Sequence, residues 1–159
     1  MNYSIDIQTA CEEIIPVSKK TLKQWIKIVL PMHKPRAALT LRLVSVAEMQ
    51  TLNATYRKQD KPTNVLAFPA QVPPSVRLRY PLLGDLIVCP AVLMEESRNK
   101  HIPLIAHWAH IIIHGVLHLL GFDHQATEDT ARMQAEEIRL LANLHFANPY
   151  SPHEDLYLE

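Results

Sequence analysis

The chain is organised around residues 101–124, which read HIPLIAHWAHIIIHGVLHLLGFDH. Six of its nine histidines lie in this stretch. The last three form the pattern H-x3-H-x5-H at His114, His118 and His124, with Gly121 before the third. Residues four apart lie one turn apart on the same helix face, so the first two imidazoles can bind one metal ion. Gly121 allows the chain to turn back at a helix end and bring in the third.

Three imidazole ligands predict an open metal site. A tetrahedral zinc ion with three protein ligands keeps its fourth position for water or substrate, as catalytic zinc sites do. Imidazole also binds iron, copper and nickel, so the spacing alone does not choose the metal. We expect one Zn²⁺ per chain.

Two further histidines, His110 and His107, continue the ligand face one and two turns upstream. His110 is interpreted either as a contact to a ligand or substrate, or as a buried histidine bonded to the backbone. For His107 the buried role is expected. The opposite face of this helix is apolar, which predicts burial against a sheet and a rigid mount for the ligands.

The metalloprotease pattern H-E-x-x-H places a general base directly after the first histidine. Gly115 occupies that position, which argues against peptide hydrolysis. Asp123, beside His124, either orients a ligand imidazole through its other N–H or caps the turn.

Composition indicates one globular domain over residues 1–159, because 48% of the residues are hydrophobic and 20% are charged. The N-terminus has no signal-peptide pattern, and no apolar stretch is long enough for a membrane span. With only two cysteines, reduced thiols and a cytoplasmic location are expected.

Charge is unevenly distributed although the net charge is zero. Residues 57–79 are mainly basic, and the segment from Glu128 onward is mainly acidic. This asymmetry either steers an anionic substrate to one face or is ordinary surface charge. The basic residues are Arg57, Lys58, Lys61, Arg77 and Arg79.

Apolar periodicity predicts an α+β fold with one small mixed β-sheet of about four strands, covered by about five helices that include the central histidine helix. The strands are expected at 3–8, 38–44, 65–68 and 84–89. The helices are expected to end near residues 30, 55, 99, 120 and 144, three of them capped by Ser18, Ser45 and Thr127. From about residue 145 the tail is expected to be irregular.

Residues 114–124, HGVLHLLGFDH, resemble the signature of the YbeY family, the bacterial endoribonucleases and ribosomal RNA maturation factors. Three other segments also resemble that family: HWAH at 107–110, LGDLIV at 83–88 and YRKQDKPTNVLAFP at 56–69. The resemblance covers about residues 52–124, and NPY at 148–150 resembles a common ending of the family.

This resemblance implies a metal-dependent endoribonuclease specific for single strands. It implies action in late ribosome (30S subunit) quality control and in maturation of the 3′ end of 16S ribosomal RNA. The implied zinc ligands are His114, His118 and His124. The implied partners are ribosomal RNA, the small ribosomal subunit and ribosome-assembly proteins, with no membrane.

The family's functional arginine maps onto Arg57, and an arginine fork suits a phosphodiester. Without the resemblance, the favoured interpretation of Arg57 is an ordinary surface charge at a helix end. The chain departs from the family pattern at Lys58, Gln59 and Ala67, where a glycine, a basic residue and a serine are usual.

Two other functions are weighed against the ribonuclease. One is a non-catalytic ribosome-assembly factor with a structural zinc, which the neutral net charge and the lack of an evident general base support. The other is a metalloprotease, which Gly115 disfavours.

Overall fold

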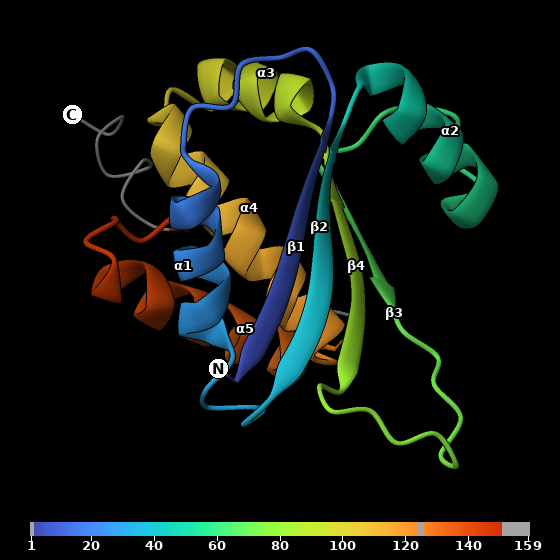
Figure 1. Cartoon of the computed structure of the whole chain (residues 1–159). Helices are drawn as coiled ribbons and strands as arrows, with labels where there is room; N and C mark the ends of the chain where they lie inside the picture. The colour runs from blue at the N-terminus through green and yellow to red at the C-terminus, as the bar shows by residue number, and fades with distance from the viewer. Residues whose placement is uncertain (1, 124–125, 151–159) are drawn as a thin grey trace.

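The computed structural model describes residues 2–123 and 126–150 (Figure 1). Strands and helices alternate along most of the chain, ending in three consecutive helices. In chain order the elements are β1 (Tyr3–Ala10), α1 (Lys19–Val29), β2 (Ala37–Val44), α2 (Val46–Arg57), β3 (Val65–Pro69), β4 (Leu82–Val88), α3 (Pro90–Lys100), α4 (Leu104–Leu119) and α5 (Thr127–Asn143).

One four-stranded sheet forms the centre, with strand order β1-β2-β4-β3. β1, β2 and β4 are parallel, whereas the edge strand β3 is antiparallel to β4. With five helices around it in the described chain, this sheet confirms the predicted α+β fold and its mixed sheet. No described helix has both the length and the apolar character that crossing a bilayer requires.

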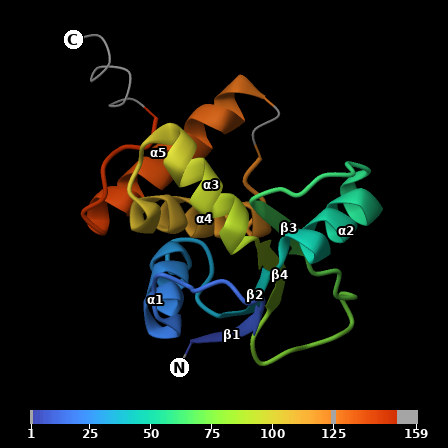
Figure 2. The same ribbon diagram turned by 90° about the horizontal axis from the view of Figure 1, so that it is seen from above.

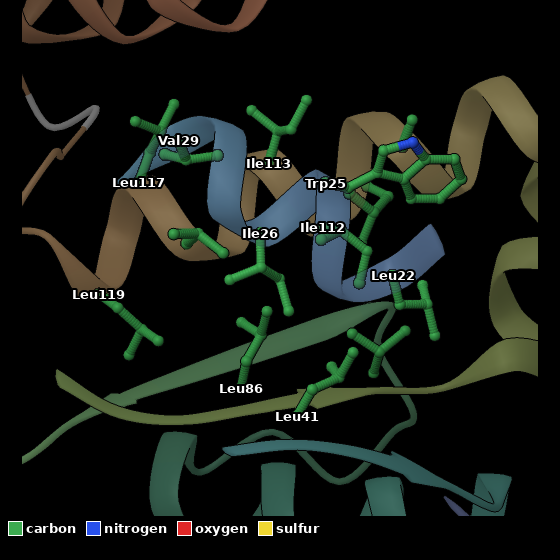
Figure 3. Packing of buried hydrophobic residues seen from close by; sticks show 14 of the residues in the cluster. Leu22, Trp25, Ile26, Val29, Leu41, Leu86, Ile112, Ile113, Leu117 and Leu119 are labelled. Atoms are coloured by element: carbon green, nitrogen blue, oxygen red, sulfur yellow. The ribbon is translucent and has the colours of Figure 1, made fainter. Parts of the chain in front are cut away.

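Helices cover both faces of the sheet. α1, α4 and α5 gather on one side, with α4 between the sheet and α5, while α2 lies on the other side (Figures 1 and 2). The larger core therefore lies between the sheet and α1 and α4. In Figure 3, Leu22, Ile26 and Val29 of α1 face α4 side chains above Leu41 and Leu86 of the sheet.

α4 ends in a glycine cap of the kind that the sequence predicts. Gly121 has a φ of 101°, the left-handed region that glycine adopts without strain. Its N–H donates to the His118 carbonyl, and the Phe122 N–H donates to the Leu117 carbonyl, both at 3.0 Å. This pair of bonds is a Schellman motif, which ends the helix and turns the chain back toward its last turn.

The predicted caps are confirmed in two of three cases. Ser18 and Ser45 accept hydrogen bonds from the N–H groups three residues later. The prediction that Thr127 caps α5 is wrong: the cap position is Ala126, and Thr127 is the first helical residue. Extended backbone at Ala126 moves the start of the helix one residue earlier, so the Thr127 side chain stands inside the first turn.

Two glycines with positive φ give a matched test of close packing. A Cβ at Gly84 (φ 139°) would overlap the backbone of Phe68 on β3 and of Ala70 just after it, whereas a Cβ at Gly121 meets nothing within 4 Å. Both substitutions to alanine carry backbone strain, but only Gly84→Ala must also displace a neighbouring strand. We expect Gly84→Ala to lower the unfolding free energy by about 2–4 kcal/mol and Gly121→Ala by about 1 kcal/mol. Urea unfolding of the metal-free protein measures both, and equal losses would contradict this packing.

Candidate functional site

Four histidines of α4 form a continuous row on the face turned away from the sheet. His107, His110, His114 and His118 follow one another with ring-centroid distances of 6.5, 6.1 and 4.6 Å. Their spacing of three, four and four residues keeps them on one side of the helix, as predicted. The opposite side is buried against α1 and the sheet, which fixes the orientation of the row.

His114 and His118 face each other through their Nε2 atoms, which lie 3.1 Å apart. Two imidazole nitrogens bound to one tetrahedral zinc at about 2.0–2.1 Å would lie about 3.3–3.4 Å apart. The observed pair therefore has nearly the separation that a shared ion requires. This geometry fits the metal that the predicted ligand pattern implies.

Glu137 of α5 contacts the ring nitrogen of His114 that faces away from His118. Its carboxylate is 1% exposed and accepts hydrogen bonds from His114 Nδ1 at 3.2 Å and from His110 Nε2 at 2.9 Å. The Tyr150 hydroxyl donates to the same carboxylate at 2.7 Å. Because His114 donates from Nδ1, the lone pair of its Nε2 points toward His118, as a metal ligand requires.

The charge of Glu137 follows from these contacts. Burial raises the pKa of a carboxyl group, but the hydrogen bonds from His110, His114 and Tyr150 outweigh burial and lower the pKa of Glu137 to about 2. Burial and the adjacent carboxylate raise the pKa of the Tyr150 hydroxyl. Glu137 is therefore ionised and Tyr150 is neutral at neutral pH.

Sequence reasoning missed Glu137 and Tyr150 as members of the site. A signal for Glu137 was present, because it falls on the apolar stripe of α5 between Met133 and Leu140, Leu141. An acid on a buried face needs a partner, since an unpaired buried charge is costly. For Tyr150 the resemblance of NPY at 148–150 to a family ending marked the segment, but it did not indicate a contact with Glu137, because that contact depends on how the chain after α5 folds back.

The structure brings together a second group of possible ligands that overlaps the predicted one. Ligand atoms of His110, His114 and Glu137 lie within 4.8 Å of one another. His114 is the one residue that this group shares with the predicted ligands. In this group His114 Nδ1 lies toward Glu137, whereas in the predicted set its Nε2 would bind the metal beside His118. His124, the third predicted ligand, lies outside the described residues, and its role stays a prediction. Asp123 lies exposed in the turn after Gly121, and its proposed role beside His124 also stays a prediction.

His107 has the buried role expected for it, with a different partner. It is 3% exposed, and its Nε2 lies 2.9 Å from the Glu96 carboxylate rather than against a backbone carbonyl. Asn64 donates to both oxygens of Glu96 at 3.3 Å. Burial raises the pKa of Glu96, but hydrogen bonds from His107 and Asn64 outweigh it and hold that pKa below its ordinary value.

Gly115 has a structural reason to be glycine. It is buried on the sheet side of α4, where a Cβ would overlap the Leu86 side chain of β4. A glutamate at this position would point into the core and away from the histidine row. In this fold, the position that carries the general base of a protease therefore has no room for a glutamate side chain.

Arg57, at the end of α2, lies against the edge strand β3. Its Nη2 donates to the Ala67 carbonyl at 2.9 Å, and its Cζ lies 5.3 Å from the Phe68 ring centroid. The side chain is exposed and forms no ion pair within residues 2–123 and 126–150. Its guanidinium therefore keeps donors available for an anion.

A cavity of about 1240 Å³ runs along the histidine face of α4. His107, His110 and His114 line it together with Asn64 and with the chain after α5 up to Tyr150. His114 of the candidate metal pair thus borders a space large enough for part of a polymer, rather than a closed pocket.

Glu96 gives a pH-dependent stability. Its pKa in the folded protein is below the unfolded value of about 4.3. The stabilisation is therefore fully present above that unfolded pKa and is lost as the pH falls from there through the lower folded pKa. We expect Glu96→Gln to flatten the fall in unfolding free energy between about pH 5 and 3 in urea titrations. Glu95→Gln, at an exposed neighbour, should keep the wild-type pH profile, and a profile shared by both variants would contradict the assignment.

Comparison with known proteins identifies the family. A family model described as Endoribonuclease YbeY matches residues 6–145. Proteins named Endoribonuclease YbeY from Legionella pneumophila strains Corby and Lens are 50% identical over 155 residues, which is 98% of this chain and 98% of each relative. The solution structure of TM1509 from Thermotoga maritima is 26% identical, covers 95% of both chains and superposes with a TM-score of 0.58.

The matched range contains the histidine row, Glu137 and Arg57, and the identity extends over nearly the whole chain. These similarities bear out the resemblance seen in residues 52–124. The chain belongs to the YbeY family of endoribonucleases, hydrolases that cut phosphodiester bonds within RNA.

Proposed function

We propose that this endoribonuclease is metal-dependent and specific for single-stranded RNA. In this proposal it acts in late ribosome (30S subunit) quality control and in maturation of the 3′ end of 16S ribosomal RNA. Its partners are ribosomal RNA, the small ribosomal subunit and ribosome-assembly proteins, and it works in the cytoplasm. The cofactor is one Zn²⁺ per chain, held by His114, His118 and His124.

The observation that carries the proposal is the fixed pair of imidazoles. His114 Nε2 and His118 Nε2 lie 3.1 Å apart, and the buried Glu137 carboxylate sets the tautomer of His114. Such a carboxylate–histidine contact both orients a metal ligand and raises its basicity. A bound zinc supplies a Lewis acid for a phosphoryl oxygen and lowers the pKa of water.

The remaining chemistry falls to residues that bind and orient the substrate. Arg57 carries a planar fork of donors that matches a phosphodiester, and it stabilises negative charge that develops on the phosphate. His110 lies beside His114 on the cavity wall, 2.9 Å from Glu137, where it can contact the RNA next to the cleaved bond. The cavity along α4 gives the strand room to lie against His110 and His114.

Metal binding separates the two possible ligand sets. If His114, His118 and His124 bind zinc, His118→Ala should abolish stoichiometric binding, while Glu137→Gln should weaken it about 10–100-fold by loosening His114. Competition with a chelating dye measures both affinities on the purified apoprotein. Loss of binding in Glu137→Gln with normal binding in His118→Ala would instead assign the ion to His110, His114 and Glu137.

Arg57 is tested by cleavage with the metal left in place. We expect Arg57→Ala to reduce the rate of single-stranded RNA cleavage about 100–1,000-fold, the usual cost of losing one donor to developing charge. Zinc content should stay at the wild-type value, and the variant should remain folded, with only the small loss of stability that follows from removing the bond to Ala67. Lys58→Ala, which removes the neighbouring exposed cation, is the control and should cleave within a few fold of wild type. Unchanged cleavage by Arg57→Ala would remove Arg57 from the mechanism.

A further inference from the structure

A group of cations gathers at the amino end of the parallel strands, outside the metal site. β2 and β4 are adjacent and parallel, so the loops that precede them meet at one end of the sheet. Ala38 N–H, at the start of β2, donates to the Pro81 carbonyl at 2.8 Å and ties this strand to the end of the loop before β4 (lower part of Figure 1). The cations that the two loops carry are Lys34, Arg36, Arg77 and Arg79, all exposed.

An aromatic ring lies among these cations. The Cζ atoms of Arg36 and Arg79 are each 5.7 Å from the centroid of the Tyr80 ring. Proteins that bind single-stranded nucleic acid combine cations along the backbone with aromatic side chains on which bases stack. We call Lys34, Arg36, Arg77, Arg79 and Tyr80 the amino-end basic surface.

The arginines of this surface differ from most others in the part of the chain that the structure describes. Arg42, Arg132 and Arg139 each have a carboxylate within 4.0 Å. Arg36, Arg77 and Arg79 form no ion pair within residues 2–123 and 126–150. Their positive charge is therefore not neutralised by described acidic side chains, and it complements a polyanion.

Contacts of His33 place the loop that carries Lys34 and Arg36 next to the carboxyl end of α4. His33, in the same loop as Lys34, packs edge-on against Phe122 with ring centroids 5.3 Å apart. Its Nε2 also lies 3.5 Å from Glu136 of α5. Phe122 follows the cap of α4 and comes two residues before His124. The loop that carries Lys34 is held on its other side by the Tyr3 hydroxyl, which donates to the Lys34 carbonyl at 2.7 Å.

We propose that the amino-end basic surface binds single-stranded RNA on its way to the metal centre. Phosphates of the strand lie against the four cations, and one base stacks on Tyr80. This proposal rests on the proposed function, because it names a path for that substrate. The exposed Val76 and Leu78 in the same loop would suit a protein partner, but the unpaired charge around an aromatic ring favours RNA.

The test measures RNA binding apart from cleavage. The probe is a fluorescent 12-nucleotide single strand of 2′-O-methyl RNA, titrated with zinc-loaded full-length protein over a series of salt concentrations. We expect the double variant Arg77→Ala, Arg79→Ala to bind more weakly and to lower the slope of log K against log salt by about 1.4, about 0.7 for each phosphate that the protein no longer neutralises. The matched control is Lys19→Ala, Lys20→Ala, which removes two exposed charges from the first turn of α1, at the opposite end of the sheet.

A second pair of variants tests stacking. Tyr80→Leu should weaken binding at least about 5-fold, because one stacked base contributes about 1 kcal/mol or more. Tyr80→Phe keeps the ring and should bind like the wild type. Thermal melts show whether each variant is folded. Because Arg77 and Arg79 are exposed loop residues, their variant keeps the test decisive if Tyr80→Leu does not fold.

The outcomes separate this proposal from the proposed function. Wild-type binding and salt slope in Arg77→Ala, Arg79→Ala, with normal RNA cleavage by the wild type, would overturn the basic surface alone and leave the loop to a protein partner. An equal loss of affinity in the Lys19, Lys20 control would also overturn it, because the effect would then be general charge. A zinc-loaded wild type that neither binds nor cleaves single-stranded RNA would overturn both.

Discussion

Close packing of α4 on the sheet is the constraint on which the site depends. One side of this helix is apolar and buried, and at Gly115 the helix comes so near β4 that a side chain would overlap Leu86. A helix fixed in this way cannot rotate without exposing its core side chains, so the opposite side must face outward. That side carries the row of histidines, whose arrangement is therefore set by hydrophobic packing and not by the metal.

A buried carboxylate on α5 fixes the ring orientation of two histidines of α4. Two imidazoles with facing nitrogens bind a metal well only if their protons lie on the other ring atoms. The Glu137 carboxylate keeps the proton of His114 on Nδ1 by accepting a hydrogen bond from it. The same carboxylate also accepts hydrogen bonds from His110 and from the Tyr150 hydroxyl. The cost of burying Glu137 is offset by these charge-assisted hydrogen bonds, which also link the chain after α5 to the centre of α4.

The basic parts of the surface lie outside the histidine row. Arg57 is held on β3, and His33 places the loop that carries Lys34 and Arg36 beside the turn that follows α4. The acidic residues that balance them in the sequence are mostly on α5, where several form ion pairs. A net charge of zero therefore conceals a separation of charge that suits an enzyme acting on RNA.

Local sequence patterns determined much of this protein. The alternation of apolar residues in 3–8 and 38–44, the caps at Ser18 and Ser45, and the glycine turn at Gly121 each depend on a few neighbouring residues, so they could be predicted. The spacing of His114 and His118 depends only on helix geometry, and their shared face followed from it. Tertiary structure decided the rest. Glu137, Tyr150 and Glu96 reach the histidines only because distant helices and loops pack against α4, and the four amino-end cations meet only because β2 and β4 are neighbours. Contacts between segments far apart in the chain produce no periodic pattern of residues in the sequence, so they could not be predicted from it. These segments come together only when the sheet and its helices fold.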